Sequence, residues 1–389
     1  MHPATLLSLY PTDLFDKKII DINPKKLKIY VDVKNISRAL FVDNIVAEIA
    51  HKTDTQGYLD SSIFQSTIFY SSWWKEYCRE RGFQMEMYFC VDNGPSCYHR
   101  DIDKRYKENR KIARVNLPFY YNDLEGIRRK NFDLSHKICN SIPSLYFFYL
   151  QNLESDFVPY YLITRKFREE KDTVHIICSG DKDLYQCLID NNVFVLGKSK
   201  LGVSICSQKN YLHKYLDLEK KSLDTKIKKI GQIKNINVEK FSLLMALVGD
   251  TVDCVEGISS LGPIKALDIV SNDAIMEKYF GSYDSIVDRL IKEESILLSK
   301  EPSDNKYVNK IIEQEEKLNK SFKLISFEML CKWLEKKASL KEIETLKYFD
   351  NILSKNNFEI ISDKNVFKYM MNQLPDNKIT DLEINRLYL

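Results

Sequence analysis

The sequence lacks the paired cysteines that zinc sites and disulfide frameworks need. Its nine cysteines are an odd number, are scattered along 389 residues, and include no Cys-x-x-Cys pair. A reducing compartment is therefore expected, namely the cytoplasm, which would be that of a bacterial host if a phage encodes the protein. The six histidines are also scattered, and none adjoins the strand-end acids considered below. Histidine-based catalysis therefore gains no support.

Long apolar runs and a strong net charge are missing as well. No apolar stretch reaches the ~18 residues of a membrane helix, and the run Leu6–Tyr10 is too short and too poorly flanked for a signal peptide. The net charge of +3 is too small to indicate a partner, so only local patches carry information. With 44% hydrophobic and 29% charged residues, the chain is expected to form two or three soluble domains with no membrane contact.

What the sequence does contain is a short apolar run, 175–178, that ends in acidic residues. Asp181 and Asp183 follow this run directly, and helical spacing of apolar residues begins at Leu184. Two carboxylates are therefore expected on the tight turn between a buried strand and a helix. Ligands bind at such turns in open α/β sheets, although helix capping explains one isolated turn of this kind equally well.

Three further predicted strands end in the same way. Asp32 lies near the end of 27–33, Asp92 directly follows 85–91, and Glu154 and Asp156 follow 144–150; short edge strands are expected at 193–196 and 203–206. Helical patterns separate these strands, which indicates a mostly parallel sheet. Because parallel strands end on one side of a sheet, all six carboxylates should line one crevice. Such like charges repel unless cations neutralise them, and oxygen ligands favour Mg²⁺, with Mn²⁺ as a substitute.

Two other segments are compatible with nucleic acid. The segment 100–137 holds eleven Lys and Arg against six acids, with interleaved aromatic residues, which suits a single strand; a solvated helical face explains the charge as well. A predicted helix from 241 runs into Asp250, and a tight hairpin at 257–263 leads into another helix. Such a hairpin exposes amides that can hold a backbone phosphate. Asp250 and Asp253 either extend the carboxylate set or cap this turn.

In this order the motifs resemble those of the flap-endonuclease-like 5′-nucleases. This family includes the 5′-nuclease domain of bacterial DNA polymerase I, phage 5′-exonucleases and the T-even phage RNase H. Ser179–Gln186 is similar to its second acidic motif, 90–93 with 106–110 to the strand-end Asp and the base of its helical arch, and 249–263 to its helix–three-turn–helix DNA clamp. Two residues depart from the pattern. Phe157 stands where bacterial members often have a further Asp, and Ser260 replaces the first glycine of the usual Gly-x-Gly.

The resemblance implies a PIN-like α/β fold, with a mostly parallel sheet flanked by helices. It further implies a nuclease core at 1–240 with the arch at about 100–137, a helix–three-turn–helix DNA-binding region at 241–300, and a helical C-terminal region at 301–389. The metal ligands implied for two Mg²⁺ ions are Asp32, Asp92, Glu154, Asp156, Asp181, Asp183, Asp250 and Asp253. Lys107 and Arg110 would contact the scissile phosphate. The expected DNA-binding residues are Arg105, Tyr106, Arg114, Gly257, Gly262 and Lys265.

The implied function is that of a structure-specific 5′-nuclease that requires divalent metal. It would act as a 5′→3′ exonuclease and flap endonuclease near the 5′ ends of DNA, or of RNA primers on DNA, during replication or repair. DNA junctions or RNA–DNA hybrids are the expected partners, and a replication clamp or a single-strand-binding protein is a partner by analogy alone. Two alternatives stay open, a 5′→3′ exoribonuclease on a related core and a non-catalytic DNA-binding protein of the same fold.

Overall fold

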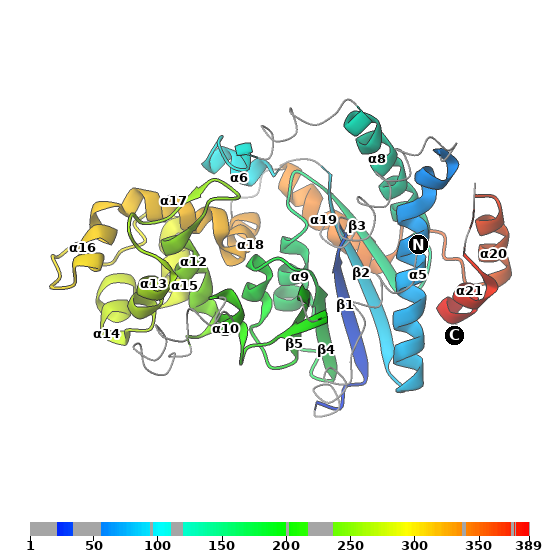
Figure 1. Cartoon of the computed structure of the whole chain (residues 1–389), viewed down its shortest axis with the longest axis horizontal. Helices are drawn as coiled ribbons and strands as arrows, with labels where there is room; N and C mark the ends of the chain where they lie inside the picture. The colour runs from blue at the N-terminus through cyan, green and yellow to red at the C-terminus, as the bar shows by residue number, and fades with distance from the viewer. Residues whose placement is uncertain are drawn as a thin grey trace.

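The computed structural model describes residues 22–33, 56–93, 96–109, 120–199, 202–216, 236–336, 340–374, 377 and 379–388. Its centre is a six-stranded sheet in the order β3-β2-β1-β4-β5-β6 (Figure 1). The strands are β1 Lys26–Asp32, β2 Gln84–Asn93, β3 Leu145–Gln151, β4 Thr173–Cys178, β5 Val193–Ser199 and β6 Gly202–Cys206. Neighbouring strands from β3 to β5 are parallel, and β6 is antiparallel to β5. The six predicted strands and the mostly parallel sheet are confirmed.

One face of the sheet is purely apolar. Leu27, Ile29 and Val31 of β1 alternate with polar or aromatic residues, and all three join a buried cluster with Phe64 and Trp74. This alternation buries one side of each strand against long helices. The helices on this side are α5 Gln56–Glu80 and α8 Tyr120–Cys139, with α20 Lys364–Asn372 and α21 Asp381–Tyr388 packed outside α5 (Figure 1).

The opposite face carries a row of aromatic rings across four strands. Tyr30 of β1 stacks on Tyr88 of β2 at 5.0 Å between ring centroids, and Tyr88 stacks on Tyr146 of β3 at 4.8 Å. On the other side, the hydroxyl of Tyr30 lies 3.0 Å from Nδ1 of His175 in β4. Cross-strand aromatic pairs stabilise a sheet and fix its register. The row therefore supports the register that brings the carboxyl ends of these strands level.

A second, larger core begins on this face and continues into a helical half of the molecule. Phe157 is fully buried in this core, at the start of α9. The elements on this side are α6 Cys97–Ile102, α9 Phe157–Tyr161, the π-helix η2 Leu162–Lys166, the 3-10 helices η3 Asp183–Cys187 and η4 Val238–Lys240, α10 Tyr211–Tyr215, α12 Phe241–Val248, the two-residue strands β7 Gly249–Asp250 and β8 Val255–Glu256, α13 Pro263–Val270, α14 Asp273–Ile275, the π-helix η5 Met276–Phe280, α15 Tyr283–Ile291, α16 Lys306–Glu313, α17 Glu315–Ile325, α18 Phe327–Lys336 and α19 Leu340–Ser354.

The C-terminal helices are spread over the whole molecule. Figure 1 shows α16 to α18 beside α12 and α13, α19 beside the sheet, and α20 and α21 at the far side of α5. At the sheet edge, the hydroxyl of Tyr348 in α19 accepts a hydrogen bond of 3.0 Å from the backbone nitrogen of Tyr149 in β3. The segment 301–389 thus joins both halves, while the three-part division at 240 and 300 stays a prediction.

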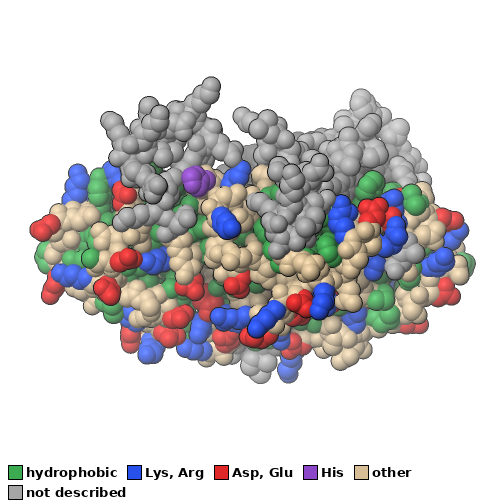
Figure 2. Space-filling view, turned by 90° about the horizontal axis from the view of Figure 1, so that it is seen from below, with side chains coloured by type: hydrophobic (Ala, Val, Ile, Leu, Met, Phe, Trp, Pro, Cys, Tyr) green, Lys and Arg blue, Asp and Glu red, His purple; other side chains and the backbone are tan. Residues whose placement is uncertain are grey.

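The charged side chains of both signs are mixed on the surface, in agreement with the small net charge. On the face drawn in Figure 2, Lys and Arg side chains are interspersed with Asp and Glu. Among the residues that the structure describes, no helix is long and apolar enough to cross a membrane.

Candidate active site at the carboxyl edge of the sheet

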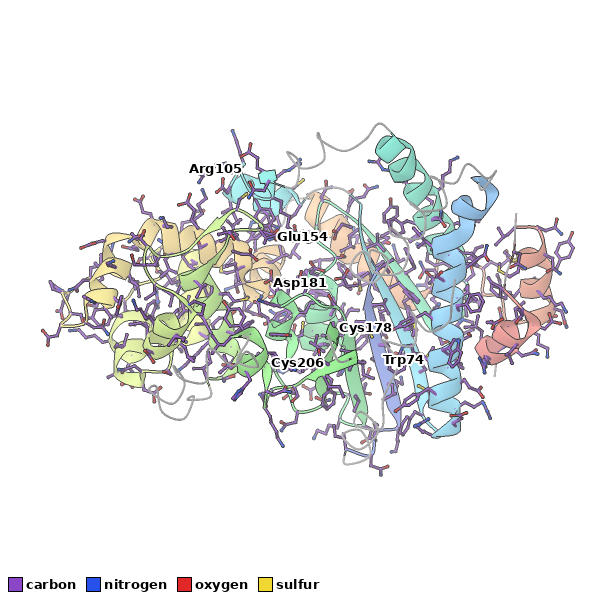
Figure 3. All side chains as sticks on the ribbon, viewed as in Figure 1. Trp74, Arg105, Glu154, Cys178, Asp181 and Cys206 are labelled. Carbon is purple, nitrogen blue, oxygen red and sulfur yellow. The ribbon has the colours of Figure 1, made fainter. Side chains whose placement is uncertain are left out.

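The carboxyl ends of the parallel strands lie at the junction between the sheet and the helical half. Figure 3 shows Glu154 and Asp181 at this junction, with Arg105 above them on the segment after α6. Asp32 is the last residue of β1, and Asp92 is the penultimate residue of β2. Because these strands pair in parallel, the acids at their carboxyl ends lie at the same edge of the sheet.

Hydrogen bonds within the turn after β4 hold its two carboxylates in place. The hydroxyl of Ser179 donates to Oδ2 of Asp32 at 2.8 Å and accepts from the backbone nitrogen of Asp181 at 3.1 Å. Oδ1 of Asp181 then accepts from the backbone nitrogen of Asp183 at 3.0 Å. The helix expected after Asp183 is the short 3-10 helix η3. The side-chain amide of Gln186 donates hydrogen bonds to the carbonyls of Asp183 and Ile325, and these bonds keep the turn tight.

The acids form two electrostatic groups that share Asp181. Burial, together with the charges of Asp32, Asp181 and Asp92, raises the pKa of Asp156 well above its ordinary value. Burial, together with the charges of Asp181, Asp250 and Asp253, likewise raises the pKa of Asp183. Both carboxyls therefore favour either a proton or a nearby cation. Asp250 and Asp253 of the hairpin region thus act electrostatically on the strand-end set.

Lys107 supplies positive charge to these acids. Its ammonium nitrogen lies 2.6 Å from Oε1 of Glu154 and 3.5 Å from Oδ2 of Asp253, and its backbone nitrogen donates to the carbonyl of Asp253 at 3.0 Å. Burial opposes charge on Glu154, but the charge and hydrogen bond of Lys107, with a 3.1 Å bond from Tyr106, lower the pKa of Glu154 to about 2. Glu154 is therefore ionised and paired.

The hairpin beside this site depends on close backbone packing. Gly249 has φ +79°, and a Cβ on Gly257 would lie 2.0 Å from the carbonyl oxygen of Val248, so neither position has room for a side chain. Ser260 adopts φ +64°, the left-handed conformation that the family's glycine would favour. Oδ1 of Asp250 accepts from the backbone nitrogen of Val252 at 2.8 Å. Asp250 therefore caps the turn in addition to its effect on Asp183.

The donor chemistry of the site fits a hard divalent cation. All the strand-end donors are carboxylate oxygens, and burial together with mutual repulsion raises the pKa values of Asp156 and Asp183. Across the described ranges, however, no group of three or more His, Cys, Asp or Glu side chains is arranged to hold a metal ion. The eight ligand assignments therefore stay a prediction.

Comparison with known proteins identifies the architecture. Neither a protein family model nor a curated protein matches the sequence. Among solved structures, bacteriophage T5 D15 protein crystallised with metal ions has a TM-score of 0.55 and 17% identity, over 85% of this chain and 99% of that one. Bacteriophage T5 D15 flap endonuclease, in a pseudo-enzyme-product complex with DNA and metal ions, has a TM-score of 0.56 and 17% identity over 85% and 98%. T5 5′-exonuclease with bound zinc gives 0.56 and 16% over 85% and 99%.

The chain has the fold of bacteriophage T5 flap endonuclease. The PIN-like class expected from the sequence is thereby confirmed. In this T5-type fold, the position of Phe157 is explained by packing, since its ring lies 5.5 Å from that of Tyr161 and 6.2 Å from that of Phe349. An Asp there would lie in an apolar core, away from water.

In this T5-type fold, the residues that the sequence predicts to bind DNA differ in how accessible they are. Lys265 is exposed, and Gly262 has no heavy atom within 4 Å of its would-be Cβ. Arg105 is exposed but already bonded to Glu256 at 3.0 Å. Tyr106 departs from the prediction, because its ring is buried and stacked on His99 at 4.6 Å and is unavailable to a base.

Two predicted residues lie in a part of the chain that is not described, and two residues near the site were not predicted. Arg110 and Arg114 lie outside the described residues. Ser179 and His99 were missed by sequence reasoning, although the Ser-Gly-Asp motif signals the former. His99 is held by Ser96, the N-cap of α6, and by the carbonyl of Leu324, a distant partner that no local pattern reveals.

Proposed function

We propose that this protein is a divalent-metal-dependent, structure-specific 5′-nuclease. It hydrolyses phosphodiesters near the 5′ ends of DNA, or of RNA primers annealed to DNA, during replication or repair. The observation that carries the proposal is the pair of carboxylate groups that share Asp181, beside the ammonium group of Lys107, at the carboxyl edge of the sheet in a T5-type fold. The solved T5 relatives hold metal ions and, in one case, DNA.

The carboxylates supply the metal-binding chemistry in this proposal. One group, around Asp156, and the other, around Asp183, would each hold an Mg²⁺ or Mn²⁺ ion, which relieves the repulsion that raises their pKa values. Such ions lower the pKa of a bound water and stabilise charge on a leaving oxygen. Ser179 fixes the carboxylate of Asp32, and Asp181 fixes the turn that carries Asp183.

Lys107 supplies positive charge to the substrate. Its ammonium group lies between Glu154 and Asp253, so a scissile phosphate held near the ions would come within its reach. Hydrogen-bond donors aimed at a phosphoryl group stabilise the charge that develops in the transition state. Tyr106 and His99 position Glu154 and thereby the ammonium group of Lys107. Arg110 would assist from the arch.

The substrate shape follows from two separate binding features. The hairpin 257–265 exposes backbone and Lys265 and has no aromatic side chain for base stacking, which suits duplex DNA. The basic arch segment 100–137, including Arg105 and Arg114, suits a single strand. A protein that uses both binds best at a junction between duplex DNA and a free 5′ strand.

Cleavage of matched 5′-labelled substrates tests the proposal. Nicked, 5′-flapped and single-stranded DNA, an RNA–DNA hybrid and single-stranded RNA are compared in Mg²⁺, Mn²⁺ and EDTA. We expect cleavage near the 5′ end of junction substrates with metal and none in EDTA. Cleavage of single-stranded RNA alone would favour the exoribonuclease alternative, and duplex binding without any cleavage would favour the non-catalytic one.

A further inference from the structure

A cluster of lysines lies on the helical half, outside the site described above. Lys265 of α13 lies with its ammonium nitrogen 4.5 Å from the ring centroid of Tyr307 in α16, and the nitrogen of Lys306 lies 5.3 Å from the same centroid. Lys310 follows four residues after Lys306 on α16, which places both on one face of the helix. The four residues, Lys265, Lys306, Tyr307 and Lys310, are called the α16 cluster below.

Among the described residues, the lysines of the α16 cluster differ from three neighbouring lysines in forming no ion pair. Nearby lysines form ion pairs: Lys300 with Glu315 at 2.5 Å, Lys317 with Glu256 at 3.3 Å, and Lys320 with Asp103 at 2.6 Å. In the part of the chain that the structure describes, none of the three lysines of the α16 cluster pairs with a carboxylate. The positive charge of the cluster lowers the pKa of Tyr307, chiefly through a hydrogen bond from Lys265.

The α16 cluster is tied to the predicted DNA clamp. Oε1 of Gln314, at the end of α16, accepts hydrogen bonds from the backbone nitrogen and the hydroxyl of Ser259, at 3.1 and 3.0 Å. Ser259 precedes the left-handed Ser260 and the open Gly262 of the hairpin. Figure 1 shows α16 beside α13, at the end of the molecule opposite α20 and α21. These two hydrogen bonds thus join the hairpin to the end of α16.

The chemistry of the α16 cluster selects a nucleic-acid backbone rather than bases. Ammonium groups bind phosphates as point charges without sequence preference. The ring of Tyr307 is half-buried and lies beside the ammonium groups of two lysines, so it orients these groups rather than presenting a fully exposed face to a base. Single-stranded sites depend on exposed aromatic rings. Phosphates on a duplex therefore fit the cluster better than an unpaired strand does.

We propose that Lys306, Tyr307 and Lys310 of α16 extend the hairpin's contact with double-stranded DNA, binding duplex phosphates beyond those that Lys265 and the hairpin amides reach. This inference rests on the proposed function, because it takes duplex DNA as the substrate. It assigns a duplex-binding role to a segment, 301–336, for which sequence reasoning gave none. The segment would contact backbone phosphates of the DNA, whatever the base sequence.

Binding measurements on the full chain test this inference. Fluorescence anisotropy in EDTA, where no cleavage is expected, compares wild type with Lys306→Ala/Lys310→Ala on a labelled DNA duplex over a range of salt concentrations. Two lost phosphate contacts should reduce the slope of log K against log salt by about 2, since each contributes about 0.9. At low salt the affinity should fall about tenfold.

The matched control removes two paired lysines, one from the segment before α16 and one from α17. Lys300→Ala/Lys317→Ala lowers the net charge equally, but its lysines already pair with Glu315 and Glu256, so we expect little change in affinity or slope. Urea unfolding of Lys306→Ala/Lys310→Ala should match that of wild type, which shows that the variant folds.

Three results overturn the inference while leaving the proposed function intact: an unchanged salt slope on duplex, an equal loss in the control, or an equal loss on single-stranded DNA. If wild-type protein shows the lysine-dependent duplex binding but cleaves no substrate in Mg²⁺ or Mn²⁺, the proposed function fails and the duplex-binding surface stands.

Discussion

The ammonium nitrogen of Lys107 lies 2.6 Å from Oε1 of Glu154, which joins the segment after α6 to the acid that follows β3. The same nitrogen lies 3.5 Å from Asp253 of the hairpin region. One side chain thus links three segments that are distant in the sequence. Glu154 and Asp253 raise the pKa of Lys107 despite its burial, so the group stays protonated.

The first prediction concerns this lysine. Lys107→Ala should lower single-turnover cleavage by about a hundredfold or more, as loss of a transition-state donor does. The matched control is Lys104→Ala, which removes an exposed lysine three residues earlier. We expect the control to cleave like wild type in quench-flow measurements. A Lys107→Ala rate within a few-fold of wild type would assign Lys107 a purely structural role.

The second prediction concerns the turn after β4. Asp181→Asn and Asp183→Asn should each abolish cleavage in Mg²⁺ while retaining DNA binding. In EDTA the melting temperature of Asp183→Asn should rise above that of wild type, because the change removes one of several repelling carboxylates. Asp190→Asn, an exposed position outside the site, is the control. Near-normal cleavage by either variant contradicts the assignment of that residue as a metal ligand.

The third prediction separates two hairpin glycines. Gly257→Ala should destabilise the protein by about 1–3 kcal/mol or more, because the added methyl would lie 2.0 Å from the carbonyl oxygen of Val248. Gly262→Ala meets no atom within 4 Å and should fold normally. Urea unfolding measures both. Equal stabilities would show that the backbones at Gly249 and Gly257 do not pack as closely as described.

The fourth prediction is a pH dependence of stability. Burial, with a smaller contribution from the charge of Lys28, lowers the pKa of His175 to about 3, against ~6.5 in an unfolded chain. Between these values the unfolded state binds a proton that the folded state excludes. Stability from this group is therefore complete above pH ~6.5 and declines as the pH falls towards about 3.

A substitution isolates this contribution. His175→Gln keeps an acceptor for the hydroxyl of Tyr30 but does not titrate. The loss of unfolding free energy between pH 7.5 and pH 5 should then be smaller by about 2 kcal/mol than in wild type. His213→Gln, at an exposed position, is the control and should retain the wild-type dependence. Identical pH profiles for wild type and His175→Gln would contradict the burial of an uncharged imidazole.

Sequence reasoning succeeded where structure depends on local periodicity. The strands ending at Asp32, Asn93 and Cys178 were predictable because short apolar runs with turn residues specify buried parallel strands. Parallel pairing then brings their ends together without further information. The position of these strand-end acids at one edge of the sheet was therefore predictable, while their role as metal ligands stays a prediction.

Features that depend on distant partners were not predictable. The burial of Tyr106 rests on its stacking with His99, whose ring is held by the carbonyl of Leu324, 225 residues further along the chain. The α16 cluster needs α13 and α16 to be adjacent, which the spacing of lysines within either helix does not reveal. Pairing of Arg105 with Glu256 likewise depends on tertiary packing.

The position of α19 has a consequence for solubility. β3 is an edge strand, and such a strand offers unpaired backbone groups to any neighbouring chain. Tyr348 accepts one of these hydrogen bonds, and Phe349 packs at 5.2 Å from Phe148 of β3, so α19 shields this edge. A protein from which α19 had been deleted would expose an aromatic-rich strand, Leu145–Gln151, to edge-to-edge aggregation.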